Sequence, residues 1–112
     1  LVTLSATPMV RSPQRAAACF ITEGALLSPA ELHARLVPES LLVILQYTAP
    51  LWRPAAPEAI RTPLLWLAGD ADAVIPEPVQ RRSASYYGAD YRVVPGAGHD
   101  LMLERSSADT AR

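Results

Sequence analysis

The segment from Pro63 to Pro76 reads P-L-L-W-L-A-G-D-A-D-A-V-I-P, and it decides the fold. Its apolar run, Leu64 to Ala68, is bounded by turn residues, which is typical of a strand buried on both faces of a parallel sheet. Gly69 to Pro76 is then expected to form a loop. The segment therefore predicts a strand that delivers the carboxylates of Asp70 and Asp72 to one edge of a sheet.

The residues that follow complete a strand–helix–strand unit. Residues 78–87 are predicted to form a helix that ends at Gly88, because glycine is favoured just after a helix C-terminus. Ala89 to Val94 form the second predicted strand, and residues 95–98 form a loop that leads into His99. The strands of such a unit are parallel and joined by a right-handed crossover. The predicted fold class is therefore α/β.

Parallel strands place their C-terminal ends at the same edge of the sheet, so Asp72 and His99 are expected to meet there. A carboxylate beside an imidazole fixes the tautomer of the ring and stabilises its protonated form. The ordinary pKa of histidine, near ~6.5, suits proton transfer at neutral pH. Alone, however, an aspartate after a strand is usually a turn or capping residue, and a histidine in a glycine-rich loop usually packs or faces solvent. Taken without a family, the residues leave both interpretations open.

The motifs around these residues resemble those of the α/β-hydrolases. The acid-bearing segment of that family is an apolar strand followed by G-x-x-D, an apolar pair and proline, and Gly69 and Asp72 match its two fixed positions. Residues 94–104, V-P-G-A-G-H-D-L-M-L-E, resemble the segment that carries the family's histidine. The resemblance implies that Asp72, rather than Asp70, is the acid of a catalytic triad and that His99 is its base. It also implies that no metal or organic cofactor takes part.

The resemblance extends more loosely over the rest of the chain and predicts three parts. Residues 1–12 are expected to form a strand and turn of the core sheet, since residues 1–8 resemble the strand after the nucleophile-bearing helix. Residues 13–59 occupy the place of a helical cap insertion that covers the active site. Residues 60–112 are expected to be the C-terminal part of the hydrolase core. The predicted fold is thus a partial α/β-hydrolase fold with parallel strands, a crossover helix and a cap.

The expected cap contains two helix signals. Ser28, Pro29 and Glu31 form a capping box with proline at the first helical position, and Leu32 and Leu36 then fall on one face. Pro38 breaks this helix, and a second helix is predicted through Tyr47. A strand over residues 41–45 is the alternative. Residues 35–40 also resemble a cap segment of some esterase-like and lipase-like members of the family. In this chain, Glu39 and Ser40 are interpreted as the break of one helix and the start of the next.

The nucleophile of the expected triad is missing from the sequence. The family carries it in a G-x-S-x-G turn, but no two glycines of this chain are four residues apart. The five glycines also cannot make a phosphate-binding loop or a complete G-x-G-x-x-G motif. The chain is therefore expected to be the C-terminal portion of a longer hydrolase that acts on a small-molecule acyl substrate, and to be inactive alone.

Other functions remain open alternatives. The same fold supports dehalogenases, peroxidases and acyl transferases, which differ in the nucleophile and the pocket. A non-catalytic fragment is the other possibility. Its exposed sheet edge at residues 1–5 would pair with the missing N-terminal half of the fold or with a second copy of the chain.

Composition excludes several classes of function. The 112 residues carry a net charge of −1 without a basic stripe, which argues against nucleic-acid binding. The longest apolar run, residues 41–45, is too short to span a membrane. Cys19 is the only cysteine, so no internal disulfide is possible, and a lone thiol favours a cytoplasmic location. Of the larger side chains, Met102 and Trp66 are expected to pack in the core. Trp52, Leu41 and Ile44 are expected to pack there or to line an acyl pocket.

Overall fold

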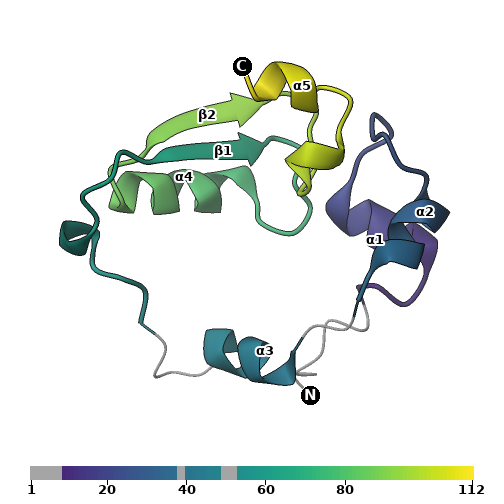
Figure 1. Cartoon of the computed structure of the whole chain (residues 1–112), viewed down its shortest axis with the longest axis horizontal. Coiled ribbons are helices and arrows are strands. Elements are labelled where there is room, and N and C mark those ends of the chain that lie inside the picture. Colours follow the sequence, from purple (N-terminus) through teal and green to yellow (C-terminus); the bar gives the residue numbers. More distant parts are fainter. Residues whose placement is uncertain (1–8, 38–39, 49–52) are drawn as a thin grey trace.

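The computed structural model describes residues 9–37, 40–48 and 53–112. Its elements, in chain order, are α1 (Pro13–Phe20), α2 (Pro29–Arg35), α3 (Leu41–Thr48), the 3-10 turn η1 (Pro57–Ala59), β1 (Leu65–Gly69), α4 (Glu77–Tyr86), β2 (Asp90–Val94), the 3-10 turn η2 (Leu101–Leu103) and α5 (Ser107–Thr110) (Figure 1). The strand predicted at residues 1–5, together with Glu39 and Trp52, lies outside the described residues, and so do the side chains of Leu41 and Ile44.

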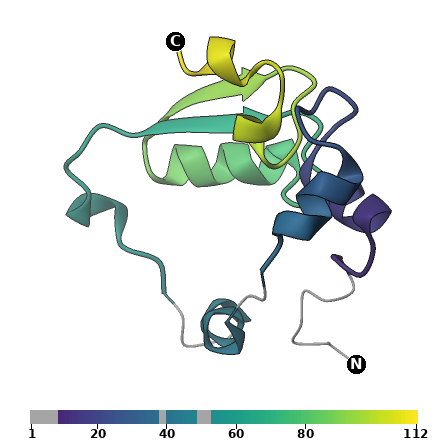
Figure 2. The ribbon, with the colours of Figure 1, turned by 45° about the vertical axis from the view of Figure 1, so that its right-hand side comes forward.

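The strand–helix–strand unit predicted from residue 60 onward is confirmed. Strands β1 and β2 are parallel, with Leu65 opposite Asp90 and Gly69 opposite Val94. Helix α4 connects them and packs along one face of the sheet (Figures 1 and 2). Trp66 of β1 points to this helix, where its indole N–H donates to Oε1 of Gln80 over 3.2 Å. Gly88, with a φ of +63°, follows α4 as the sequence predicted.

The prediction that the first strand is buried on both faces is only partly right. Ala68 and Gly69 are buried, but Leu65 is 57% exposed. Helix α4 covers the face that carries Trp66, whereas on the other face an apolar cavity of about 490 Å³ lies between Leu67 and residues 101–111. The described residues thus leave one face of the sheet incompletely filled.

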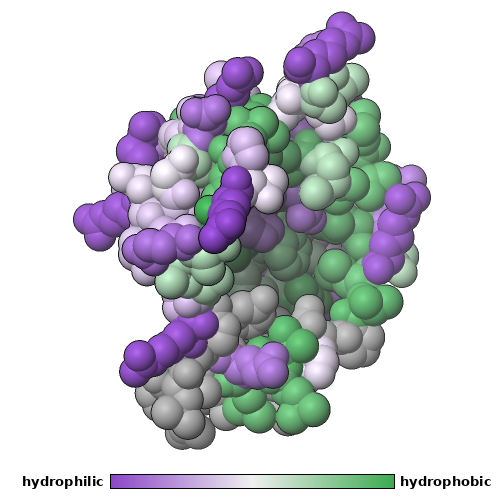
Figure 3. Space-filling model, turned by 60° about the vertical axis from the view of Figure 1, so that its left-hand side comes forward, coloured by the Kyte–Doolittle hydropathy of each residue, from purple (hydrophilic) through white to green (hydrophobic). Residues whose placement is uncertain are grey.

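The prediction for Met102 is also wrong, because this residue lies on the same incompletely covered face of the sheet. It was expected in the core, but it is 69% exposed and lines the cavity beside Leu67. In the space-filling view, hydrophobic residues make up much of the surface beside the charged side chains (Figure 3). To bury Met102, more atoms would have to pack over the Leu67 face of the sheet than the described residues place there.

Helices α1 and α2 pack together and bury a small core of their own. Ser12 caps α1 by accepting the N–H of Arg15, and the core consists of Ala16, Ile21 and Leu32. The capping box predicted for α2 is present: the side chain of Ser28 accepts the N–H of Glu31, whose carboxylate accepts the N–H of Ser28. Leu36 packs against the core beside Leu32, as the predicted common face requires.

Helix α3 confirms the helical rather than the strand interpretation of residues 41–45. It stands apart from the sheet and from the α1–α2 pair in both ribbon views (Figures 1 and 2). No helix of the described part is long and apolar enough to cross a membrane. The predicted boundaries after residues 12 and 59 stay predictions.

The α1–α2 pair is joined to the C-terminal part of the chain by backbone hydrogen bonds. The N–H of Asp100 donates to the carbonyl of Phe20 over 2.8 Å, and the N–H of Leu26 donates to that of Leu103 over 2.7 Å. Ala25 and Glu104 form an antiparallel bridge next to the second of these bonds. The end of α1 is thereby held against the loop that carries His99.

Candidate active site

Asp72 lies in the turn that follows β1, and its side chain is only 4% exposed. Its Oδ1 accepts the backbone N–H groups of Val74 and Ile75 over 2.8 and 2.9 Å, which is the side-chain turn expected of an aspartate after a strand. This turn aims the second carboxylate oxygen, Oδ2, away from the backbone. Asp72 is therefore both the turn residue of one interpretation and the candidate acid of the other.

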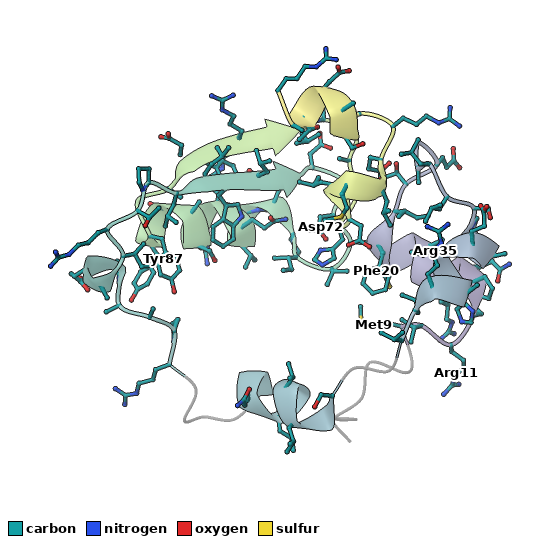
Figure 4. All side chains as sticks on the ribbon, viewed as in Figure 1. Met9, Arg11, Phe20, Arg35, Asp72 and Tyr87 are labelled. Atoms are coloured by element: carbon teal, nitrogen blue, oxygen red, sulfur yellow. The ribbon has the colours of Figure 1, made fainter. Side chains whose placement is uncertain are left out.

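His99 lies in the loop after β2, and the structure brings it to Asp72. Its Nδ1 is 3.0 Å from Oδ2 of Asp72, and its side chain is 30% exposed. Among the described residues, none forms a hydrogen bond with Nε2. The ring of Phe20 lies 5.9 Å from the imidazole, between centroids, and Phe20 extends from the end of α1 toward the loop of Asp72 (Figure 4). An ionised Asp72 can only accept, so neutral His99 carries its proton on Nδ1 and keeps a lone pair on Nε2.

Asp72 is held in its ionised form. Burial acts to raise its pKa, but hydrogen bonds from the backbone of Ile75, from His99 and from the backbone of Val74 outweigh burial, so that the pKa lies below the ordinary value. The neighbouring Asp100 shows the opposite balance. Burial raises the pKa of Asp100 above its ordinary value. The charge of His99 acts to lower this pKa, and the charge of Asp72 acts to raise it. At neutral pH the carboxylate beside Nδ1 is therefore charged.

Because the pKa of Asp72 is lowered by folding, its charge is expected to stabilise the chain above the unfolded pKa of about 3.9. This contribution is lost as the pH falls through the lower pKa of the folded state. We expect the difference in free energy of unfolding between the unsubstituted chain and Asp72→Asn, measured in urea, to be larger at pH 7 than at pH 2.5. A difference that does not change with pH would contradict the lowered pKa.

The approach of the two loops depends on Gly69, the last residue of β1. A side chain here would overlap the carbonyl oxygen of Ala97, and its Cβ would lie 2.5 Å from that of Gly98. Asp70, the other acid of the motif, does not reach His99 by a hydrogen bond; its Oδ1 accepts the N–H of Gly96 over 2.6 Å. Asp70 thus braces the histidine loop, while Asp72 contacts the histidine.

Glu104 is a site residue that the sequence analysis missed. It is 2% exposed, and its Oε1 accepts the N–H groups of Thr22 and Gly98, the residue before His99, over 2.9 and 3.1 Å. Its Oε2 accepts the hydroxyl of Thr22 over 2.8 Å. A single acid at the end of an apolar run is the sequence signal that could have singled it out. Glu104 ties the histidine loop to the end of α1.

Replacing Glu104 by Leu is expected to lower the free energy of unfolding by about 3 kcal/mol, because it leaves the buried N–H of Gly98 and the partly buried N–H of Thr22 without an acceptor. Urea denaturation followed by circular dichroism measures this loss. Glu23→Leu is the matched control, because Glu23 is exposed and follows Thr22 in the chain. It should change the free energy of unfolding by less than about 0.5 kcal/mol. Equal effects of the two substitutions would show that the buried hydrogen bonds contribute little.

Gln80 of α4 is the second residue that was missed. It is 7% exposed, and its Nε2 donates to Oδ2 of Asp72 and to the carbonyl of Ile75, over 2.9 Å in both cases. Oδ2 is therefore shared between Gln80 and His99. The signal available in the sequence was a glutamine four residues before Ala84, on the face of the helix that turns to the strand.

The described residues offer no group of three His, Cys, Asp or Glu side chains that could hold a metal ion. A cavity of about 600 Å³ lies between α1 and α2 and includes Ile21, Leu26 and Arg105, but neither Asp72 nor His99 lines it. The chemistry available at the site is thus proton transfer by an imidazole that Asp72 orients and whose Nε2 has no hydrogen-bond partner among the described residues.

Comparison with known proteins matches the chain to a family. The model of a family described as the alpha/beta hydrolase family matches residues 4–112. No curated protein and no solved structure matches the chain. The match covers the two motif segments and the residues between them.

Proposed function

Because the chain belongs to the α/β-hydrolase family, we propose that Asp72 and His99 are the acid and base of a triad that hydrolyses carboxylic esters or related acyl bonds. The observation that carries this proposal is the contact of 3.0 Å between Nδ1 of His99 and Oδ2 of Asp72, with no described residue bonded to Nε2. This arrangement leaves Nε2 of a side chain that is 30% exposed without a hydrogen-bond partner among the described residues, so Nε2 can accept a proton.

In the proposed reaction, Nε2 of His99 removes the proton of a hydroxyl nucleophile as the nucleophile attacks the acyl carbon. The imidazolium then gives this proton to the leaving alcohol, and a water molecule activated by the same nitrogen releases the acyl group. Asp72 stabilises the imidazolium in both steps. A carboxylate that is ionised at neutral pH is the state that this role needs.

We further propose that the nucleophile and the oxyanion hole lie outside these 112 residues. The glycine spacing of the sequence supports this, because it contains no G-x-S-x-G turn. An oxyanion hole alone contributes about 3 kcal/mol to lowering the barrier in enzymes of this kind. Without these groups His99 has only water to activate, so the 112 residues by themselves should hydrolyse an acyl ester slowly or not at all.

The test compares the 112-residue chain with a longer protein that carries a strand–G-x-S-x-G–helix segment before Leu1. A short p-nitrophenyl ester should be hydrolysed by the longer protein and not by the chain. His99→Gln should abolish the activity, while His33→Gln, whose ring contacts the carbonyl of Val10 instead, should retain it. Activity of His99→Gln equal to that of the unsubstituted longer protein would rule out His99 as the base.

A further inference from the structure

The side chain of Gln80 connects β1 to the acid of the candidate site. Its carbonyl oxygen accepts the indole N–H of Trp66, and its amide nitrogen donates to Asp72 and to the carbonyl of Ile75. Within the described residues, no buried polar atom of a side chain lacks a hydrogen-bond partner. This buried amide uses its carbonyl oxygen as an acceptor and its nitrogen as a donor.

The orientation of the amide is fixed by its neighbours. The indole nitrogen of Trp66 can only donate, so it requires the oxygen of Gln80 on its side. The carbonyl of Ile75 and the carboxylate of Asp72 can only accept, so they require the nitrogen on theirs. All three neighbours thus agree on one orientation, and rotation of the amide by 180° would break each of these bonds.

We propose that Gln80 is a positioning residue that fixes Oδ2 of Asp72 toward His99 and tunes the basicity of the imidazole. This inference rests on the proposed function for its catalytic consequence, but its structural part does not. The N–H of Gln80 shares Oδ2 with Nδ1 of His99, so it withdraws part of the negative charge that would otherwise stabilise the imidazolium. The backbone bonds to Oδ1 and the Gln80 bond to Oδ2 together prevent rotation of the carboxylate.

A purely structural role is the competing explanation. In that case Gln80 would only join α4 to β1, and its replacement would lower stability without changing the titration of His99. The two roles are separable because the chain holds only two histidines, His33 and His99, and His33 contacts Val10 away from the site. His33 therefore serves as the internal reference in every NMR titration. Asp100, whose charge interacts with that of His99, is unchanged in all variants.

The decisive variant is Gln80→Met in the 112-residue chain, with both imidazoles titrated by NMR. Methionine has a similar length but no N–H to donate to Asp72, so Oδ2 keeps its full negative charge for the imidazolium. We expect the titration midpoint of His99 to rise by about half a pH unit relative to His33. The control, Gln46→Met on the exposed surface of α3, should leave both midpoints in place. An equal response of His99 in the two variants would overturn the proposal.

The unsubstituted chain provides a reading that does not depend on any variant folding. The side-chain amide protons of Gln80 should exchange with water far more slowly than those of Gln46, and their signals should shift as Asp72 titrates in acid. Exchange as fast as that of Gln46 would show that the bond to Asp72 is not formed, and would overturn the proposal.

The catalytic consequence is measured in the longer protein that contains the nucleophile. Gln80→Met should lower kcat about tenfold and leave KM nearly unchanged, since the residue does not contact the substrate. If His99→Gln remains active, the proposed function itself is wrong. If His99→Gln is inactive while Gln80→Met has full kcat and an unshifted His99 midpoint, only the role of Gln80 is wrong.

Discussion

Replacing Asp72 by Asn is expected to lower kcat for ester hydrolysis about 10,000-fold in the longer protein that carries the nucleophile. The amide keeps an oxygen for the N–H groups of Val74 and Ile75, so the turn survives. In place of Oδ2, however, it presents N–H groups to Nδ1 of His99. The imidazole must then accept at Nδ1 and carry its proton on Nε2, which is the wrong tautomer for a base.

Asp70→Asn is the matched control, because it makes the same chemical change two residues earlier. The amide oxygen can still accept the N–H of Gly96, and His99 is not among the hydrogen-bond partners of Asp70. We expect this variant to keep most of its activity in a p-nitrophenyl ester assay. A comparable loss in Asp70→Asn and Asp72→Asn would remove the distinction between the two acids on which the proposed function depends.

Replacing Gly69 by Val is expected to lower the free energy of unfolding by about 3 kcal/mol. The new side chain would overlap the backbone at Ala97 and Gly98, and backbone atoms cannot move aside as a flexible side chain can. The loop that carries His99 would have to move away from β1. The separation of Asp72 and His99 should therefore increase together with the loss of stability.

Gly88→Ala separates this steric effect from the conformational freedom of glycine. Gly88 has a φ of +63° and no atom within 4 Å of an added Cβ. Its replacement by Ala should therefore lower the free energy of unfolding by only about 1–2 kcal/mol. Its distance in the chain from both loops leaves the contact of Asp72 with His99 intact. Urea denaturation gives both free energies, and a loss in Gly69→Val no greater than that in Gly88→Ala would contradict the steric argument.

The sequence predicted the parts of the molecule that depend on local signals and on topology. The meeting of Asp72 and His99 follows from parallel strands whose C-terminal ends share an edge. The start of α2 follows from the capping box at Ser28, which involves only neighbouring residues. The family assignment follows from motifs that lie within short segments, and the family match confirms it.

The rest could not be predicted because it depends on contacts between distant residues. Glu104 is 82 residues from Thr22, and nothing in the local sequence states that their side chains meet. Gln80 reaches Asp72 only because α4 returns along the face of β1 that carries Trp66. The exposure of Leu65 and Met102 likewise depends on what covers the sheet, which an apolar pattern alone does not specify.

The tautomer of neutral His99 tests whether Asp72 orients it as a base, and it can be read from the ¹⁵N chemical shifts of the two ring nitrogens above the titration midpoint. We expect Nδ1 to carry the proton, held by Asp72, and Nε2 to be unprotonated. In Asp72→Asn we expect the proton on Nε2 instead. A neutral ring that carries its proton on Nε2 in the unsubstituted chain would contradict the assignment of His99 as a base oriented by Asp72.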